Sequence, residues 1–397
     1  MEGEMAEMPR LDILIYGHDG RGLGHVSRSV GIGMALRRLY PQVKVLLVSG
    51  SRFTGELTGE APLDWLKLPS YETTVVAGKS KGITGKSMYS DEELGSLRAK
   101  ELAHLVALYR PRLVLVDHTP QGKHKELVFA LSASDNSTKW ILGVRGVVGS
   151  VAQARSDLAR QIFTDHYHAL FWYGDSSVLG MSHRQQLQDQ YGREALECGY
   201  VVRLAELCSW NKGLRNSDEK LAGTISIPWL GEKSMTFLAC LAKALKNIPL
   251  SLGRWHLFAG SGGSGRVRVG IDHLFSGMDN CHIESPGLRY VSSLLRSKTA
   301  LVYGGYNSLM DIMYCGIPSL VVLREMEDKE QQIHLGCLLR KTGNRLTTVG
   351  ESQVSAKELE SLLLKNLQVA QSAPFEIKTD GAVRAAYYLN QFLHGEE

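Results

Sequence analysis

Short apolar runs alternate with longer mixed segments along almost the whole chain. The apolar runs have the length and composition of buried strands, whereas the mixed segments repeat their apolar residues at helical spacing. Strands are predicted over residues 11–16, 43–48, 113–116, 140–144, 169–173, 223–227, 255–259, 282–284, 300–303 and 319–323. Helices are predicted over residues 24–39, 91–108, 151–163, 234–245, 290–296, 307–315 and 329–341. This alternation predicts an α/β fold with doubly wound parallel sheets covered by helices on both faces.

The chain is long enough for two domains, because 397 residues exceed the roughly 250–300 that one core supports. The pattern weakens over the polar residues 201–222, where we place a linker. We therefore expect a disordered N-terminus over 1–10, an N-terminal domain over 11–200 and a C-terminal domain over 223–378. The last segment, 379–397, is predicted as a helix that is a candidate to cross back to the first domain. Residues 73–90 read as either a mobile lid or a long exposed connection.

Composition narrows the class of protein only slightly. The formal charge of +4 is spread along the chain, so it does not favour nucleic acid, although a mildly basic cleft would suit a phosphorylated ligand. The six cysteines form no C-x-x-C pair, which is typical of reduced thiols in a cytoplasmic protein. We expect no signal peptide and no membrane span, because no basic start with an apolar run and no long apolar stretch is present.

A glycine-rich loop follows the first predicted strand, with Gly20, Gly22 and Gly24 within residues 17–28. Such a loop lets the backbone approach a ligand at the carboxyl end of a sheet, where doubly wound folds bind ligands. The spacing differs from the G-x-G-x-x-G dinucleotide fingerprint, so a nicotinamide or flavin enzyme is disfavoured.

His25, at the end of this loop, is the candidate general base. It lies near a predicted helix N-terminus, where the helix dipole disfavours the protonated imidazole and leaves it able to accept a proton. Alternatively, His25 caps the helix or only hydrogen-bonds the substrate. Asp19 and His18 on the same loop are further candidates.

Asp117 and His118 follow another predicted strand directly. An acid and a histidine at the end of a strand could bind substrate or orient His25. They could equally belong to a solvated loop.

A second glycine motif lies in the other half of the chain, at Gly304 and Gly305. A buried strand leads into these glycines, and the first turn of the next helix presents N–H groups to an anion. Asp311 falls about one helical turn beyond Asn307, where a carboxylate could accept hydrogen bonds from sugar hydroxyls. The alternative is an ordinary strand–turn–helix corner.

Two such loops, one in each half, resemble the two-domain GT-B glycosyltransferases. The stretch from Gly20 to His25 is similar to the glycine–histidine loop of the N-acetylglucosaminyl transferase of peptidoglycan synthesis, although Leu23 separates glycines that are adjacent there. The stretch Gly304 to Asp311, then Gly316-Ile317-Pro318, then Asp328-x-x-Gln331-Gln332, resembles the donor-binding block of that family. The resemblance implies two Rossmann-like domains facing across a cleft.

The resemblance also implies roles for individual residues. Asp311 would hold the ribose of a nucleotide sugar, Asn307 and Ser308 the diphosphate, and Gln331 and Gln332 the donor sugar. One departure concerns the loop after the first strand of the second domain, where Pro228 and Trp229 stand in place of a phosphate-binding glycine pair. Arg266, in the glycine-rich loop 260–266, is a candidate to compensate as a phosphate partner.

These expectations combine into a glycosyltransferase that moves a sugar from a nucleotide-diphosphate donor, with UDP favoured, to an acceptor hydroxyl or amine. His25 would deprotonate a soluble small-molecule acceptor bound near Asp117 and His118. No Asp-x-Asp pair follows a strand, so we expect neither a metal nor a cofactor. The alternatives are a nucleotide-sugar epimerase or hydrolase of the same fold, and a non-catalytic nucleotide-sugar-binding protein.

Overall fold

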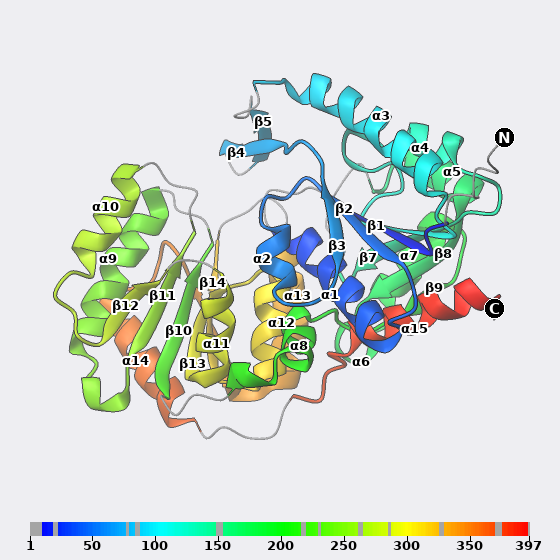
Figure 1. Cartoon of the computed structure of the whole chain (residues 1–397). Helices are drawn as coiled ribbons and strands as arrows, with labels where there is room; N and C mark the ends of the chain where they lie inside the picture. Colours follow the sequence, from blue (N-terminus) through cyan, green and yellow to red (C-terminus); the bar gives the residue numbers. More distant parts are fainter. Residues whose placement is uncertain are drawn as a thin grey trace. The chain divides into compact units, whose positions relative to one another are not determined.

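A computed structural model describes most of the chain as two separate units (Figure 1). The residues that it describes are 10–18, 23–76, 79–83, 88–147, 154–215, 220–228, 232–260, 265–284, 287–324, 329–369 and 375–395. The first unit comprises Met1–Ser176, Met181–Val201 and Asp380–Glu397. The second comprises Ser177–Gly180 and Val202–Thr379.

The first unit contains a seven-stranded sheet. Its strands are β1 (Ile13–Gly17), β2 (Val45–Ser49), β3 (Asp64–Lys67), β6 (Leu113–Asp117), β7 (Lys139–Arg145), β8 (Tyr167–Tyr173) and β9 (Ala195–Glu197). Its helices are α1 (Gly24–Leu39), α2 (Thr54–Thr58), α3 (Asp91–Tyr109), η1 (Lys123–Lys125), α4 (Val128–Ala133), α5 (Asp157–His166), α7 (Ser182–Tyr191) and α15 (Gly381–His394), with α6 (Ser176–Leu179) at the division between the units. A hairpin of β4 (Glu72–Val76) and β5 (Lys79–Ile83) lies in the region expected to be a lid or a connection.

The strand order of this sheet is β3-β2-β1-β6-β7-β8-β9, and all of its pairings are parallel. From β1, the next strands β2 and β3 are added on one side of the sheet, and β6 to β9 are then added on the other side. The order therefore reverses between β1 and β6, and the carboxyl ends of these two strands mark the position where doubly wound sheets bind ligands.

The second unit repeats this arrangement with six strands in the order β12-β11-β10-β13-β14-β15, again all parallel. The strands are β10 (Leu221–Ile227), β11 (Trp255–Ala259), β12 (Cys281–Glu284), β13 (Ser297–Tyr303), β14 (Ser319–Leu323) and β15 (Leu346–Gly350). The helices are α8 (Arg203–Trp210), η2 (Lys212–Arg215), α9 (Glu232–Asn247), η3 (Leu250–Leu252), α10 (Gly265–Leu274), α11 (Leu288–Arg296), α12 (Tyr306–Cys315), α13 (Glu330–Thr342), η4 (Gly343–Arg345) and α14 (Ala356–Gln368). The order reverses between β10 and β13. The predicted α/β class with two doubly wound parallel sheets is confirmed.

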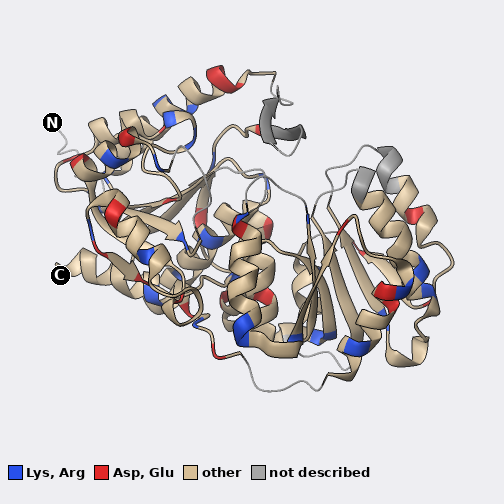
Figure 2. Ribbon diagram, turned by 180° about the vertical axis from the view of Figure 1, so that it is seen from behind, with Lys and Arg blue, Asp and Glu red and all other residues tan. Residues whose placement is uncertain are grey.

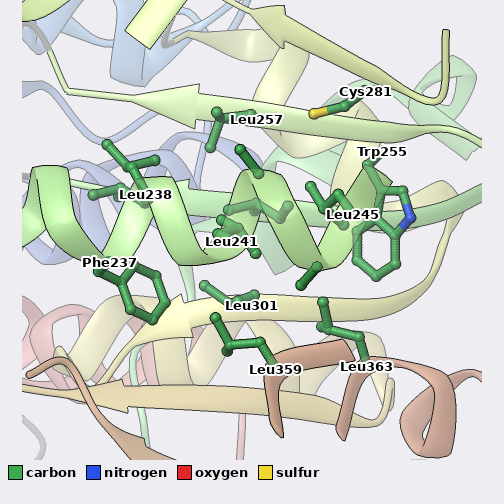
Figure 3. Packing of buried hydrophobic residues seen from close by; sticks show 14 of the residues in the cluster. Phe237, Leu238, Leu241, Leu245, Trp255, Leu257, Cys281, Leu301, Leu359 and Leu363 are labelled. Atoms are coloured by element: carbon green, nitrogen blue, oxygen red, sulfur yellow. The ribbon is translucent and has the colours of Figure 1, made fainter. Parts of the chain in front are cut away.

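Helices cover both faces of the second sheet. Figure 1 shows α9, α10 and α14 on one face and α11, α12 and α13 on the other. Leu238, Leu241 and Leu245 of α9 are buried against the sheet residues Leu257 and Leu301 (Figure 3). The strands are buried on both faces for this reason, which explains why they read as nearly continuous apolar runs in the sequence.

The two ends of the second unit differ from the expected boundaries. The region 201–222, expected as a linker, carries α8 and η2 and clusters with the second unit from Val202 onward. α8 contacts α12, and its buried residues include Leu204 and Leu207. This stretch is therefore a short amphipathic helix, whose exposed polar face accounts for the polar sequence that had indicated a linker.

The C-terminal helix α15 belongs to the first unit, where it contacts α1. Asp380 forms a β-bridge with Val201. The ring of Tyr388 lies 5.7 Å from that of Phe171 in β8. These contacts bring the last described residues of the chain back to the sheet that begins with β1.

Charged residues of both signs are distributed over the two units. Figure 2 shows Lys and Arg interspersed with Asp and Glu along the helices, in keeping with the small net charge of +4. Within the part of the chain that the structure describes, no helix is both long enough and apolar enough to cross a membrane.

Trp255 fills the space above Gly223, its partner in the register of β10 and β11. A Cβ added at Gly223 would lie 2.2 Å from Cζ3 of Trp255 and 3.0 Å from the carbonyl oxygen of Thr299. We predict that Gly223→Ala destabilises the second unit by about 1–3 kcal/mol, because the buried indole and the backbone have to shift. Thermal and urea unfolding measure the loss.

Gly336→Ala is the matched control for Gly223→Ala. A Cβ at Gly336 in α13 meets nothing within 4 Å, and alanine favours helix, so stability should be unchanged or higher. Equal stability of the Gly223→Ala variant and the wild type would contradict the packing described for β10.

Candidate functional site

The carboxyl ends of β1 and β6 bring His25 and Asp117 together. His25 is the second residue of α1, which follows β1, and Asp117 is the last residue of β6. Nδ1 of His25 contacts Oδ2 of Asp117. Asp117 is 3% exposed, which excludes the solvated loop that was one interpretation of the sequence. The sequence left two functional roles open for Asp117, binding of substrate and orientation of His25. The contact with His25 supports the second role.

Arg28, to which the sequence interpretation gave no role, completes this contact. Its Nε lies 3.2 Å from Oδ1 of Asp117, and its Nη2 lies 3.1 Å from each carboxylate oxygen. Arg28 is 2% exposed, so both charges of the pair are buried. His25 and Arg28 are three residues apart on one helix and therefore lie on the same face. This spacing was the sign in the sequence that both side chains could reach Asp117.

The protonation state of His25 follows from these neighbours. Nδ1 of His25 contacts Oδ2 of Asp117 and also lies 2.9 Å from Nη2 of Arg28. A carboxylate only accepts hydrogen bonds, so the contact with Asp117 favours a proton on Nδ1 and a lone pair on Nε2. Burial lowers the pKa of His25 well below its usual value of 6.5, and Arg28, Arg145 and Lys123 lower this pKa further. The sequence interpretation also expected a neutral imidazole but attributed it to the helix dipole; the structure adds burial and three nearby cations as causes.

Two further histidines surround His25. The ring of His118 lies 4.7 Å from that of His25, and the ring of His18 lies 5.1 Å from it. Burial lowers the pKa of His18 and of His118 well below the usual value, and the neighbouring imidazoles lower both further. Among the described residues, Nδ1 of His18, Nδ1 of His118 and Oγ1 of Thr119 are buried without a hydrogen-bond partner. The cluster therefore offers several polar atoms that a bound molecule could engage.

The backbone at His118 is strained. Its φ is +84°, in the left-handed region that costs free energy for residues other than glycine. The amide of His118 donates to the carbonyl of Gly143 in β7 at 2.8 Å, which holds the residue in place. Strain of this kind concentrates at functional sites, where the surrounding structure maintains it.

A second buried ion pair supports the loop that carries His118. Glu126 accepts hydrogen bonds from Arg98 at 2.7 and 2.8 Å, from Tyr16 at 2.6 Å and from Tyr71 at 2.9 Å. Arg98 and Glu126 are fully buried. Tyr16 lies in β1 two residues before His18, so this network connects β1 to the loop between β6 and α4.

The glycine loop itself is described only in part. Asp19 and Gly22 lie outside the described residues. Gly24 begins α1, and a Cβ added there would meet nothing within 4 Å. The space beside Gly24 is therefore not filled by the described part of the protein.

In the second unit, Gly304 and Gly305 connect β13 to α12 at the position where the strand order reverses. Gly304 packs tightly, since an added Cβ would lie 3.1 Å from a Leu323 methyl group and 3.7 Å from Oε1 of Gln331. A Cβ at Gly305 would meet nothing within 4 Å. Asn307 and Ser308 follow in the first turn of α12 and are partly exposed, at the positive end of the helix dipole.

Asp311 lies one turn further along α12 and is partly exposed. Burial raises the pKa of Asp311 from 3.8 to about 7, and the nearby charge of Arg203 opposes this rise. A carboxyl group with such a pKa at the edge of a sheet is typical of a functional position, although ion-pair networks also perturb pKa values.

The structure describes only some of the remaining candidate donor-binding side chains. Gln331 and Gln332 lie in the first turn of α13, and Gln331 approaches Gly304 as described above. Arg266 lies in α10, but its side chain is outside the described residues, as is Trp229.

A buried network that the sequence interpretation did not anticipate joins the ends of β13, β14 and β15. Glu351 accepts hydrogen bonds from Tyr303 at 2.7 Å, from Ser234 at 3.0 Å and from Arg324 at 3.0 Å. Arg324 also lies over the Tyr303 ring, 4.3 Å from its centroid. Arg324 directly follows the apolar strand β14, which was the available sign in the sequence. Glu351 directly follows β15, which was not predicted.

Among the described side chains, no group of three or more His, Cys, Asp and Glu is arranged to hold a metal ion.

No protein-family model and no curated protein matches this chain. Solved structures match over nearly its whole length. The UDP-GlcNAc 2-epimerase of Neisseria meningitidis bound to UDP-GlcNAc is 14% identical, with a TM-score of 0.57, covering 96% of this chain and 99% of that one. The MnaA–UDP structure of S. aureus is 11% identical, with a TM-score of 0.62 and 97% of each chain covered. MurG of Acinetobacter baumannii is 12% identical, with a TM-score of 0.51, covering 97% of this chain and 99% of that one.

These similarities concern the fold. The chain has the GT-B fold, and the prediction of that fold from the two glycine motifs is confirmed. At 11–14% identity, the neighbours show the architecture and leave the reaction open.

We predict that Asp311→Asn stabilises the protein at neutral and alkaline pH. Folding raises the pKa of Asp311, so the unfolded chain ionises this carboxyl more readily, and stability falls as pH rises from about 4 to about 7. The variant removes this penalty, and the Tm at pH 8 should rise by roughly 2–4 °C per kcal/mol of relieved free energy. Calorimetry at pH 4 and pH 8 measures the difference; a lower Tm for the variant at pH 8 would contradict the raised pKa.

We also predict that His25 remains neutral at pH 7 with its proton on Nδ1. Burial and the cations around the ring lower its pKa, and the Asp117 carboxylate accepts the Nδ1 proton. Nitrogen-15 NMR of the imidazole reports both the charge and the tautomer. A His25 signal that titrates above pH 6.5, or a proton on Nε2, would exclude the orientation described here.

Proposed function

We propose that the protein is a metal-independent glycosyltransferase that moves a sugar from a nucleotide-diphosphate donor to an acceptor hydroxyl or amine. The observation that carries this proposal is the neutral imidazole of His25, oriented by Asp117 at the carboxyl edge of the first sheet. The proposal makes the first unit the acceptor-binding domain and the second unit the donor-binding domain.

On the acceptor side, His25 acts as the general base. Nε2 accepts the proton of the attacking hydroxyl or amine, and the Asp117 carboxylate stabilises the imidazolium that forms. Arg28 holds Asp117 in place through both carboxylate oxygens. His118, on the adjacent loop, is proposed to bind the acceptor, together with Asp19, Gly22 and Gly24.

On the donor side, the glycine corner and the first turn of α12 bind the diphosphate. Gly304 and Gly305 allow close approach, and Asn307 and Ser308 lie where the helix dipole favours an anion. The same dipole stabilises the leaving nucleoside diphosphate as its bond to the sugar breaks. Arg266 is assigned to the diphosphate as well.

The other donor residues bind the sugar and the nucleoside. We assign Gln331 and Gln332 to the donor sugar and Asp311 to the ribose. The nucleotide is taken to be UDP, because the solved neighbours include one bound to UDP-GlcNAc and one bound to UDP. A soluble small-molecule acceptor and a cytoplasmic location belong to the same proposal.

Nucleotide-sugar epimerisation is the second candidate, because the solved neighbours include UDP-GlcNAc 2-epimerases. Such enzymes need several carboxylates around the sugar. Among the buried carboxylates in the described part of this chain, Asp117, Glu126 and Glu351 are each paired with an arginine. These three carboxylates are engaged in ion pairs, whereas His25 is a neutral imidazole, so these side chains favour transfer.

One experiment distinguishes these reactions. The protein is incubated with UDP-sugars and a panel of hydroxyl and amine acceptors, and both free UDP and isomerised sugar are measured. Release of UDP that depends on an acceptor supports transfer. Isomerised sugar without an acceptor supports epimerisation, release in water alone supports hydrolysis, and binding without release supports a non-catalytic protein.

We predict that His25→Ala lowers turnover by about 10²–10⁴-fold, because the general base is lost. The affinity for UDP should change little, since the nucleotide is assigned to the other unit. Steady-state kinetics and calorimetry measure the two effects. His104→Ala, at an exposed position of α3, is the control and should behave as the wild type. Turnover of His25→Ala within a few-fold of the wild type would exclude His25 as the base.

A further inference from the structure

Three polar side chains around His25 are buried without a hydrogen-bond partner. Nδ1 of His18, Nδ1 of His118 and Oγ1 of Thr119 make no hydrogen bond to the described residues. The three residues are 8%, 7% and 0% exposed. Buried polar groups in folded proteins nearly always have a partner, and an unsatisfied one is costly, so these atoms indicate a ligand that supplies hydrogen bonds.

The three imidazoles lie against one another. The ring of His118 lies 4.7 Å from that of His25 and 5.0 Å from that of His18, and the rings of His18 and His25 are 5.1 Å apart. Thr119 follows His118, and its amide donates to the carbonyl of Asp117 at 3.2 Å. The side chain of His25 is 15% exposed, so the cluster reaches solvent at the ring proposed as the base. A ligand that binds at His25 therefore lies beside the unpartnered atoms.

The charges in contact with this cluster neutralise each other. Nη2 of Arg28 lies 2.9 Å from Nδ1 of His25, and the same nitrogen lies 3.1 Å from each carboxylate oxygen of Asp117. A buried anion needs a cation to compensate it, and a buried ammonium needs a carboxylate. Because Arg28 and Asp117 already compensate each other, the cluster favours a neutral ligand over either ion.

Two further cations disfavour an amine in particular. Arg145 ends β7, two residues beyond Gly143, whose carbonyl accepts the amide of His118 at 2.8 Å. Burial lowers the pKa of His25, and the charges of Arg145 and Lys123 lower it further, which places both cations near the ring. An alkylamine has a pKa of about 10 and is an ammonium at neutral pH. The two cations would repel it, and His25 is too weak a base to remove its extra proton.

Hydroxyl groups match the unpartnered atoms. A neutral imidazole either donates or accepts at Nδ1, according to its tautomer, and a threonine hydroxyl does both. A ligand hydroxyl also donates and accepts, so it can pair with any of these atoms without a change of charge. Three such atoms in one cluster indicate a ligand with several hydroxyls.

We propose that the acceptor is a neutral polyol or sugar, and that His18, His118 and Thr119 bind the hydroxyls next to the one that His25 deprotonates. The inference rests on the acceptor role proposed for this unit. It narrows the acceptor from hydroxyls and amines to neutral alcohols with several hydroxyl groups, and it adds His18 and Thr119 to the residues that bind the acceptor.

The test titrates the full chain with sorbitol, glucamine and gluconate and follows the histidines by nitrogen-15 NMR. The three ligands share a polyol chain and differ in the charge at one end. Sorbitol should shift the signals of His18 and His118 and leave both rings neutral. Glucamine, which is an ammonium at neutral pH, should bind at least about tenfold more weakly. Ethanol, with a single hydroxyl, should bind too weakly to saturate either signal. The variants His18→Asn and His118→Asn assign the signals.

Thr119→Val tests the threonine hydroxyl, and Thr138→Val is its matched control. Both hydroxyls are buried, but that of Thr138 donates to the carbonyl of Pro111 at 2.7 Å. Thr119→Val should leave the Tm unchanged or higher and weaken sorbitol binding by about 3–10-fold, because this hydroxyl bonds only to the ligand. Thr138→Val should lower the Tm and bind sorbitol as the wild type does.

The outcomes separate this inference from the proposed function. If sorbitol shifts neither His18 nor His118, or if gluconate binds more tightly than sorbitol and charges either ring, the polyol assignment is wrong. Unchanged sorbitol binding by Thr119→Val would remove Thr119 from the site. If sorbitol binds at these rings but no polyol or sugar acceptor releases UDP from UDP-sugars, the polyol site stands and the proposed transfer is wrong.

Discussion

The buried ion pair between Arg28 and Asp117 is the contact on which the site of the first unit depends. A buried carboxylate is costly unless a charge and hydrogen bonds compensate it, and the guanidinium of Arg28 supplies both. Arg28 lies on the helix after β1 and Asp117 ends β6, so the pair joins the two strands between which the sheet order reverses. The same carboxylate also contacts Nδ1 of His25 and favours a proton on that nitrogen. The position of the histidine therefore depends on this interaction, whereas burial is the main cause of its lowered pKa.

The same arrangement of a buried carboxylate paired with an arginine recurs at two other places. Arg98 neutralises Glu126 beneath the loop of His118, and Arg324 neutralises Glu351 at the ends of β14 and β15. Each pair connects segments that are distant in sequence, which keeps the loops at the carboxyl edges in defined positions. Asp311 differs from these carboxylates, because it is only partly balanced by Arg203 and its pKa rises to about 7.

Local sequence patterns predicted the central strands and both glycine corners, because buried parallel strands are continuous apolar runs flanked by glycine. They did not predict β3, whose residues are exposed or half-buried, or β9, which has only three residues. They also missed β15, with its half-buried Thr347 and Thr348. The residues of the site also fall into those that the sequence predicted and those that it did not. His25 and Asp117 were recognisable from their positions after strands, whereas the pairing of Arg28 with Asp117 spans 89 residues and depends on the order of the strands in the sheet.

The fold alone cannot separate transfer from epimerisation, since the solved neighbours include a forosaminyltransferase as well as UDP-GlcNAc 2-epimerases. The two reactions differ in the groups that must move protons. Epimerisation at a sugar carbon needs groups that remove and return a proton on the sugar, whereas transfer needs one base beside the acceptor. In the first unit, the carboxylates Asp117 and Glu126 are held by arginines, and burial keeps three clustered imidazoles neutral. Of these imidazoles, only His25 contacts a carboxylate that can stabilise its charged form. A single oriented base is what transfer requires, and this distribution of proton acceptors, which the fold does not dictate, is the physical reason to prefer it.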